Sequence, residues 1–427
     1  MSVNVAAHND SSSVGARLSV MMFLQFFLWG GWYVTIGNYM KAHGMESNIP
    51  WAYSVGPIAA IISPFFLGMV ADRFFSTERI LAVMHLIGGG VLLALPSVDA
   101  GMFKILLLVH MLCYMPTLGL TNSLAFHNVT NAEKQFPIIR VFGTIGWIVA
   151  GLIVSLLLHA DTKPIQFYVA GGAGVLLGLY SLTLPHTPPP SWGRETTIHD
   201  ILGLDSIALM KNRSFATFMI SSFLICIPLA FYYAYAPVFV GDIGIADPAS
   251  KMSLGQFCEV GFMLVMPFFF ARLGVKWMLF VGMFAWVARY GLFAAASTNP
   301  LLPLVLAGII LHGACYDFFF VTGQIYVDKK ASSAIRGQAQ GFLVLVTQGV
   351  GMLIGAQAAG IIHDHYKVGE TVHWQMVWLI PCITAGVIML AFAALFRDDT
   401  QVPESEFGRE IGEVPPASGP VEAAPAP

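Results

Sequence analysis

Long apolar segments alternate with short polar loops along almost the whole chain. A helix of about 20 apolar residues crosses the ~30 Å hydrocarbon core of a bilayer, and the apolar segments reach about that length. They predict membrane-spanning helices at residues 17–41, 50–72, 79–97, 102–127, 138–160, 164–184, 214–240, 251–272, 275–297, 299–327, 334–363 and 374–396. We therefore predict an all-α polytopic membrane protein with twelve transmembrane helices.

A polar, proline-rich connection at residues 185–213 divides these helices into two groups of six. The N-terminal six-helix half covers residues 17–184, and the C-terminal six-helix half covers residues 214–397. Residues 1–16 are polar, and residues 398–427 are rich in Pro, Ala and Glu, so we expect a disordered tail at each end. The connection itself is expected to be a cytoplasmic linker between the halves.

An internal repeat supports the division into halves. The string PFF at Pro64 recurs at Pro267, and the pattern His-x-x-Cys-Tyr at His110 recurs at His312, with nearly the same offset. Because six helices separate the copies, corresponding helices keep the same orientation. This arrangement predicts two parallel halves related by an axis along the membrane normal.

The composition also indicates a membrane protein, because 56% of the 427 residues are hydrophobic and only 11% are charged. The formal net charge of −3 gives no reason to expect a nucleic-acid partner. The five cysteines lie in apolar segments without a CxxC or zinc-ligand spacing, so we expect no metal and no cofactor. An intramembrane enzyme would need a catalytic cluster, and no GxSxG or HExxH motif is present, so we do not expect an enzyme.

Lysine and arginine are concentrated in the loops on one side of the predicted helices. That side carries Arg73, Arg79, Lys134, Arg194, Lys211, Arg213, Arg272, Lys276, Lys329, Lys330 and Arg336. The opposite loops carry only Lys41, Lys104, Lys163, Lys251 and Lys367. Because cytoplasmic loops are enriched in these residues, we predict a multi-pass membrane protein with both termini in the cytoplasm.

Asp317 lies deep inside the apolar run that surrounds HGACYDFFFVTGQ. A carboxylate at the centre of a spanning helix costs about 2.5–3.5 kcal/mol on insertion scales, and such residues are usually functional. We expect Asp317 to face a central cavity and to bind a proton or substrate hydroxyls. The alternative is a structural carboxylate paired to a neighbouring helix.

Three further groups of residues stand at helical spacing and would share a helix face. These are Gln256 with Glu259, then Arg140, Thr144 and Trp147, and finally Asp317, Phe320 and Gln324. Tyr233 belongs to a cluster of aromatic residues in the seventh predicted helix. Carboxylates, an arginine, amides and aromatic rings around one cavity suit a polar solute that contains a planar ring. The alternative is that these groups satisfy each other in helix contacts.

The loop after the second predicted helix reads GMVADRFFSTER, beginning at Gly68. It resembles the signature loop of the major facilitator superfamily, Gly-x-x-x-Asp-Arg followed by a further arginine. In that interpretation Asp72 and Arg73 form a conformational gate at the cytoplasmic helix end. The resemblance implies the major facilitator fold and transport by alternating access.

Several strings together resemble the nucleoside:proton symporter family of that superfamily, the nucleoside permeases. They include FLQFFLWGGW at Phe23, FPIIRVFGTIGW at Phe136, DFFFVTGQIYV at Asp317 and WQMVWL at Trp374, and they cover nearly the whole chain. The resemblance implies import of nucleosides driven by a proton gradient across the inner membrane, and nothing in the sequence demands more than a monomer.

The resemblance also implies the binding positions. The matching residues are Arg140, Thr144, Trp147, Gln256, Glu259, His312, Tyr316 and Asp317. Asp317 would be the essential acid for proton coupling, with Glu259 beside it. The chain departs from the family pattern at Ala230 and Tyr233, which stand where the family offers amide side chains to the substrate.

Two alternatives to a nucleoside symporter remain open from the sequence. One is a major facilitator symporter for another polar solute, such as a sugar or another glycoside. The other is a receptor that binds a solute without transporting it. The expected partners are a nucleoside or a related small polar solute, protons and the lipid bilayer.

Overall fold

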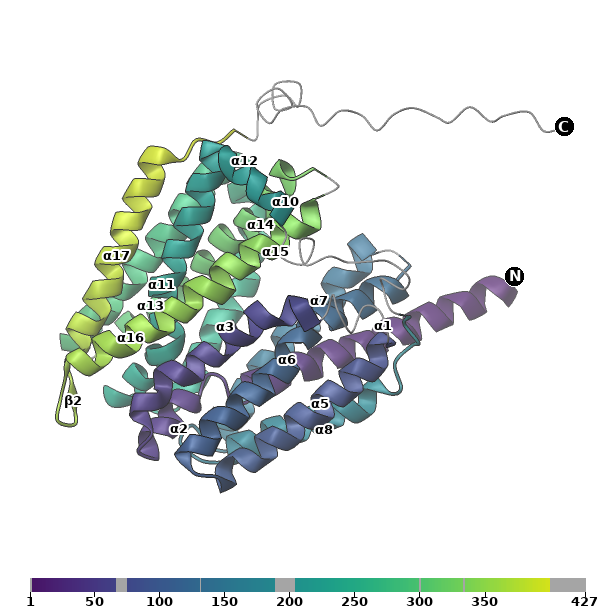
Figure 1. Ribbon diagram of the computed structural model, residues 1–427, viewed down its shortest axis with the longest axis horizontal. Helices are drawn as coiled ribbons and strands as arrows, with labels where there is room; N and C mark the ends of the chain where they lie inside the picture. The colour runs from purple at the N-terminus through teal and green to yellow at the C-terminus, as the bar shows by residue number, and fades with distance from the viewer. Residues whose placement is uncertain are drawn as a thin grey trace.

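The computed structural model describes residues 2–66, 75–130, 132–188, 204–298, 301–332 and 335–399, leaving aside the side chains of residues 2–12, 64–66, 132–134 and 204–205. The described chain is almost entirely helical, apart from a two-stranded antiparallel hairpin. Figure 1 shows the helices of the first part of the chain, in purple and blue, gathered on one side, and those of the second part, in teal to yellow, on the other.

Most helices are long enough to cross a large part of a bilayer, and several continue into a π-helical segment. The first group comprises α1 (Ser2–Gly30), α2 (Ile36–Ala42), α3 (Ile49–Phe66), α5 (Thr77–Ala94), α6 (Ala100–Asn128), α7 (Ala132–Gly151), the π-helix η4 (Leu152–Leu157) and α8 (Ile165–Ser181). The short 3₁₀ helices η1 (Glu46–Asn48) and η3 (Leu95–Ser97) lie in its connections.

The second group begins with α10 (Leu204–Ile207), the 3₁₀ helix η5 (Ala208–Lys211), α11 (Arg213–Asp242) and α12 (Pro248–Thr298). It continues with α13 (Leu302–Cys315), the π-helix η6 (Tyr316–Val321), α14 (Thr322–Lys330), α15 (Arg336–Val344), the π-helix η7 (Leu345–Gly351) and α16 (Met352–His365). The hairpin strands β1 (Lys367–Val368) and β2 (Thr371–Val372) precede α17 (Trp374–Leu395).

Nine helices in the described part of the chain are long and apolar enough to cross a membrane. One of them, α12, has 51 residues and is interrupted at Gly274, where φ is +65°. This break falls between the predicted spans 251–272 and 275–297. Glycine is suited to the position, because it adopts a positive φ without steric cost. The helix α8 is shorter and also apolar. The described part therefore supports an all-α membrane fold.

Two helix boundaries near the N-terminus differ from the prediction. The single span predicted at 17–41 is divided, because α1 ends at Gly30 and a turn precedes α2. The pair Gly30–Gly31 favours such a break, since glycine weakens a helix. In addition, α1 begins at Ser2 and so includes residues assigned to a disordered tail. No proline or glycine interrupts the chain before Gly15.

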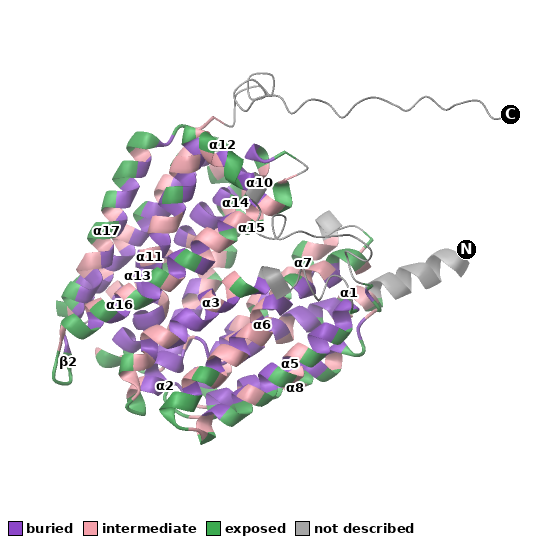
Figure 2. Cartoon of the chain, in the orientation of Figure 1, coloured by how far each residue is buried: buried purple, intermediate pink, exposed green. Residues whose placement is uncertain are grey.

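Large apolar side chains cover much of the outer surface of the helices. Leu264, Ile361 and Leu157 are each at least 70% exposed. Figure 2 shows exposed residues on the outward faces of α5, α8 and α17, while buried residues line the faces between helices. A water-soluble protein rarely exposes so much apolar surface, whereas lipid chains solvate it.

Helices in the first group approach each other closely at glycines. A Cβ atom added at Gly146 on α7 would collide with the carbonyl oxygen of Phe23 on α1. A Cβ atom at Gly89 on α5 would lie 2.7 Å from the backbone nitrogen of Val175 on α8. Small residues at helix contacts are typical of membrane proteins, because close backbone approach maximises van der Waals packing.

We expect Gly146→Val to destabilise the protein, because the new side chain would collide with backbone rather than with a flexible side chain. Overpacking of this kind costs about 1–3 kcal/mol. The measurement is the thermal unfolding midpoint of detergent-solubilised protein. Gly172→Val is the matched control, because no heavy atom lies within 4 Å of a Cβ atom added there. Equal midpoints for the two variants would contradict the packing argument.

Candidate functional site

A continuous series of aromatic contacts connects the two groups of helices. The ring of Trp147 on α7 lies 5.3 Å from that of Trp29 on α1, and Trp29 lies 5.4 Å from Tyr33. The ring centre of Tyr33 in turn lies 6.0 Å from that of Tyr233 on α11. The ring centre of Tyr233 lies 6.2 Å from that of His312 on α13. Predicted site residues from distant parts of the sequence therefore meet between the two groups.

The second group continues this series along one helix. The His312 ring lies 6.0 Å from Tyr316, and Tyr316 lies 5.2 Å from Phe320. Tyr316 and Phe320 both belong to the π-helix η6. A π-helix has more residues per turn than an α-helix, so side-chain directions shift along it. Gln324, predicted to share the face of Asp317, follows this segment on α14 and is exposed.

Asp317 lies on η6 and is completely buried. Neither oxygen of its carboxyl group has a hydrogen-bond partner among the residues that the structure describes. Its electrostatic neighbour is Glu259 on α12, which also interacts with Arg140 on α7. The alternative of a structural carboxylate paired to a neighbouring helix finds no hydrogen bond to support it among the described residues.

Arg140 lies where the two groups of helices face each other. Its guanidinium carbon lies 4.2 Å from the centre of the Phe26 ring on α1, which provides a cation–π contact. A Cβ atom at Gly143 would come within 2.7 Å of Nη1 of Arg140. Gly143 therefore leaves room for the guanidinium. Arg140 also interacts electrostatically with Tyr316 of the second group.

Gln256 and Thr144 complete the predicted set. Oε1 of Gln256 is buried and has no hydrogen-bond partner in the described structure. Thr144 is partly buried, one turn after Arg140 on α7. Gly255 next to Gln256 allows α12 to approach α13, since a Cβ atom there would lie 3.0 Å from Cβ of His312. Unsatisfied buried amide and carboxyl groups at one place are characteristic of a ligand site.

Trp29 and Tyr33 are not among the predicted binding residues, although both take part in the aromatic series. Both belong to the aromatic run FLQFFLWGGWY, which could have identified them, because Trp and Tyr usually supply the planar walls of small-molecule sites. Asp72 and Arg73, the predicted conformational gate, lie outside the described residues.

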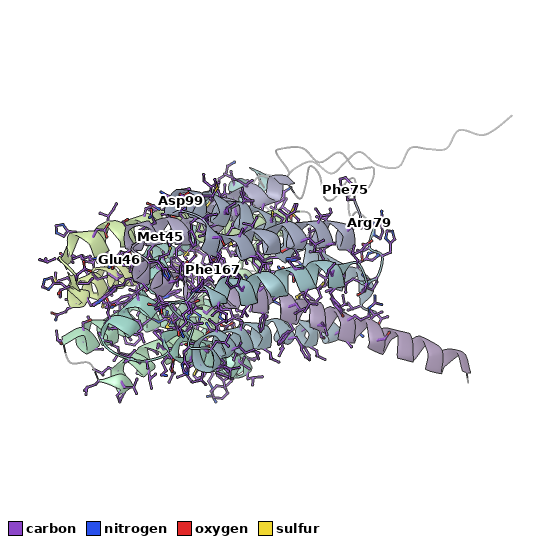
Figure 3. All side chains as sticks on the ribbon, turned by 90° about the horizontal axis from the view of Figure 1, so that it is seen from below. Met45, Glu46, Phe75, Arg79, Asp99 and Phe167 are labelled. Carbon is purple, nitrogen blue, oxygen red and sulfur yellow. The ribbon has the colours of Figure 1, made fainter. Side chains whose placement is uncertain are left out.

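Ion pairs connect the two groups of helices at one end of the site. Nζ of Lys41 on α2 lies 2.5 Å from Oδ2 of Asp242 on α11. Glu46 on η1 contacts Lys367 on β1, and this hydrogen bond raises the pKa of Lys367. Nε1 of Trp374 donates to Asp242 at 3.2 Å. In Figure 3, Glu46 lies at the end of the molecule opposite to Arg79. We call Lys41, Glu46, Asp242, Lys367 and Trp374 the ion-pair latch.

A second contact closes the same region. The carboxylate of Asp161, after η4, accepts a hydrogen bond from the backbone nitrogen of Ala249 at 3.1 Å and one from Ser155 at 2.7 Å. Nδ1 of His159 lies 3.0 Å from Asp247. Burial raises the pKa of Asp161. The first residues of α12 and the residue before them are thereby attached to the segment between η4 and α8.

Comparisons with known proteins identify similar sequences and a similar fold. The sequence profile of the family described as nucleoside H⁺ symporter matches residues 12–401. A xanthosine permease of Escherichia coli (strain K12) is 37% identical over 387 residues, covering 86% of this chain and 92% of that protein. The nucleoside permease NupG of the same organism is 35% identical over 402 residues, covering 89% and 95%.

A solved structure is also similar over the whole fold. The crystal structure of a mutant of the nucleoside transporter NupG superimposes with a TM-score of 0.84 at 32% sequence identity. The superposition covers 90% of this chain and all of that chain.

We expect Lys41→Glu to destabilise the structure, because it places a like charge beside Asp242 and Glu46. Partly exposed ion pairs contribute about 1 kcal/mol or less. The double variant Lys41→Glu with Asp242→Lys should recover part of the thermal unfolding midpoint, and a double-mutant cycle measures the coupling.

Lys163→Glu is the control for this experiment, because Lys163 is exposed and has no ion pair among the described residues. Its midpoint should stay close to that of the unmodified protein. Additive effects of the two single changes at Lys41 and Asp242 would show that this ion pair contributes nothing to stability.

Proposed function

The chain belongs to the nucleoside H⁺ symporter family, whose members are multi-pass inner-membrane proteins that import nucleosides with protons, and we propose that Asp317 is its coupling carboxyl group. The observation that carries this proposal is the complete burial of Asp317 without a hydrogen-bond partner in the described structure. An ionised carboxylate in such a position is costly, so the group has to be protonated or paired when the site is closed.

Coupling follows from that constraint. A proton taken up by Asp317 while the site is open to the outside removes the cost of enclosing a charge. The loaded site then closes, and the proton leaves on the cytoplasmic side. Glu259 is the second carboxyl group of the proposed coupling pair, because it interacts electrostatically with both Asp317 and Arg140. Proton transfer between the two carboxyl groups would let Arg140 stabilise the one that ionises.

The nucleoside is proposed to bind between aromatic rings and polar groups. The base stacks between Trp147 and the rings of Tyr233 and Phe320, because a planar base provides a face for aromatic contact. Sugar hydroxyls bind to the polar groups around that space. These are Arg140, Thr144, Gln256, Glu259, His312, Tyr316 and Asp317. Tyr233 replaces an amide side chain, so its hydroxyl is the available hydrogen-bonding group at that position.

Transport is proposed to occur by alternating access between two six-helix halves, residues 17–184 and 214–397. The break in α12 at Gly274 and the apolar helices α3 and α8 support twelve crossings. The ion-pair latch joins the halves at the end of the molecule opposite to Arg79. Arg79 is on the predicted cytoplasmic side, so the latch lies at the predicted outer end. With the outer end closed, the described state corresponds to a carrier that opens toward the cytoplasm, the side on which we propose that both termini lie.

The proposed assembly is a monomer in the bilayer, with no nucleic-acid partner. The family match over residues 12–401 favours nucleosides over the alternative of a sugar or another glycoside. A receptor without transport is likewise disfavoured, because the similar proteins are permeases.

We expect Asp317→Asn to abolish proton-driven accumulation while preserving substrate binding, because the amide keeps the shape of the side chain and cannot exchange a proton. The measurement is uptake of labelled uridine and adenosine into proteoliposomes, with and without an inward proton gradient. Accumulation should fall to the level set by equilibration, a loss of at least tenfold in the gradient-dependent part if coupling contributes about 1.4 kcal/mol or more.

Asp328→Asn is the matched control, since Asp328 lies at the end of the same helical segment and is half-exposed in a pair with Arg336. It should transport at the unmodified rate. Gradient-driven accumulation by Asp317→Asn would exclude the proposed coupling role. Absence of uptake by the unmodified, folded protein would instead show that uridine and adenosine are not its substrates.

A further inference from the structure

Arg289 is a buried charged residue that the proposed transport mechanism does not use. It lies on α12, has no exposed surface, and ranks among the largest fully buried side chains. None of its three guanidinium nitrogens has a hydrogen-bond partner among the residues described. Its guanidinium carbon lies 4.0 Å from the centre of the Tyr232 ring.

Among the described residues, no carboxyl group is found to interact electrostatically with Arg289 itself. The groups that interact with it electrostatically are Cys315, Tyr232, Tyr290, Tyr233 and His312. Thiols, phenols and imidazoles of this kind are neutral near pH 7. The hydroxyl of Tyr290 already donates to the carbonyl oxygen of Pro228 at 2.6 Å. A cation–π contact offsets only part of the cost of burying a guanidinium, so a negative group is needed to complete the site.

Other buried donors lie on the same side of the molecule. The Tyr232 ring contacts Arg289 and stacks on His312, with ring centres 5.2 Å apart and planes inclined by 17°. The Tyr232 hydroxyl and Nδ1 of His312 are buried and have no hydrogen-bond partner within the described chain. Arg289 can only donate hydrogen bonds, and a phenol or an imidazole N–H can also donate. Three adjacent side chains thus offer donors.

We propose that Arg289, Tyr232 and His312 form a binding site for a single negative charge in the second group of helices. The ligand chemistry is a small monovalent hydrogen-bond acceptor. It can be a halide ion, or the deprotonated base of an acidic nucleoside that reaches Tyr232 and His312 from the proposed substrate site. The nucleoside case rests on the proposed function, whereas the halide case does not.

The connection to the substrate site is short. His312 contacts both Tyr233 and Tyr316, and these rings belong to the aromatic series across the two groups of helices. Gly255 holds α12 against His312, so His312 has little room to move away. An anion bound beside Tyr232 would therefore contact the same imidazole that faces the nucleoside. Arg289 is in this way a specificity-determining residue, separate from the carboxyl pair that couples protons.

The experiment combines one substitution with two choices of anion. Arg289→Met removes the charge and the donors while keeping a long side chain, and Arg289→Lys keeps the charge. The first arm measures uridine uptake and the thermal unfolding midpoint in chloride and in gluconate. The second arm measures uptake of xanthosine, whose base loses a proton near neutral pH, against inosine, whose base stays neutral.

The expected result for a halide site is chloride-dependent stabilisation of the unmodified protein that Arg289→Met abolishes. For an acidic nucleoside, Arg289→Met should reduce xanthosine uptake about tenfold or more relative to inosine, the usual effect of losing a charge-assisted hydrogen bond. Arg289→Lys should retain most of either effect. Arg272→Met is the control, because Arg272 also stacks on a ring, Phe268, at 3.8 Å but is exposed.

The proposal is overturned if chloride has no effect on the unmodified protein and Arg289→Met changes xanthosine and inosine uptake equally. If Arg289→Met does not fold, the proposal is tested by thermal unfolding of the unmodified protein with each ligand. Thermal stabilisation by chloride over gluconate, or by xanthosine over inosine, supports the site, and no difference overturns it. A protein that transports no nucleoside would contradict the proposed function, while the chloride measurement would still test Arg289.

Discussion

Hydrocarbon provides no water to satisfy polar groups, and this constraint governs both the fold and the site. Backbone N–H and C=O groups must find partners within the chain, which requires helices wherever the protein meets lipid. The same constraint makes each unpaired side-chain charge costly. Asp317 and Arg289 are both completely buried, and neither has a hydrogen-bond partner in the described structure. Their presence in an otherwise apolar environment is therefore best explained by ligands.

The two charges do not compensate each other, because they belong to different surroundings. Asp317 interacts with Glu259, while the electrostatic neighbours of Arg289 are neutral tyrosines, Cys315 and His312. Our two proposals therefore assign them different chemistry, a proton to the carboxyl group and a negative charge to the guanidinium. His312 lies between these regions, since it stacks on Tyr232 and contacts Tyr316.

Glycine determines how closely the helices approach. Gly146 brings α7 against α1 at Phe23, and Gly255 brings α12 against α13 at His312. Both glycines lie beside proposed binding residues, Trp147 and Gln256. Side chains of rigidly packed helices stay in place, which is what a binding site requires. Movement between states is then left to the contacts between the two groups of helices, where the ion-pair latch and the contact at Asp161 are located.

The sequence by itself determined the class of protein, because apolar segments of bilayer length have few structural solutions. It also identified Asp317, since a carboxylate inside such a segment stands out without knowledge of any neighbour. The family strings identified Trp147, Glu259 and His312, and their positions as binding residues stay predictions. The turn after Gly30 and the start of α1 at Ser2 differed from the predicted spans, because hydropathy does not locate helix ends.

Only the tertiary structure decided which of these residues meet. Trp29 at the end of α1 contacts Trp147 on α7, and Tyr33 in the turn after α1 contacts Tyr233 on α11, so both join the site. The burial of Arg289 against the ring of Tyr232 likewise follows only from the packing of α12 against α11. Hydropathy follows from the composition of one segment, whereas pairing depends on which segments pack together, and that is set by the whole fold.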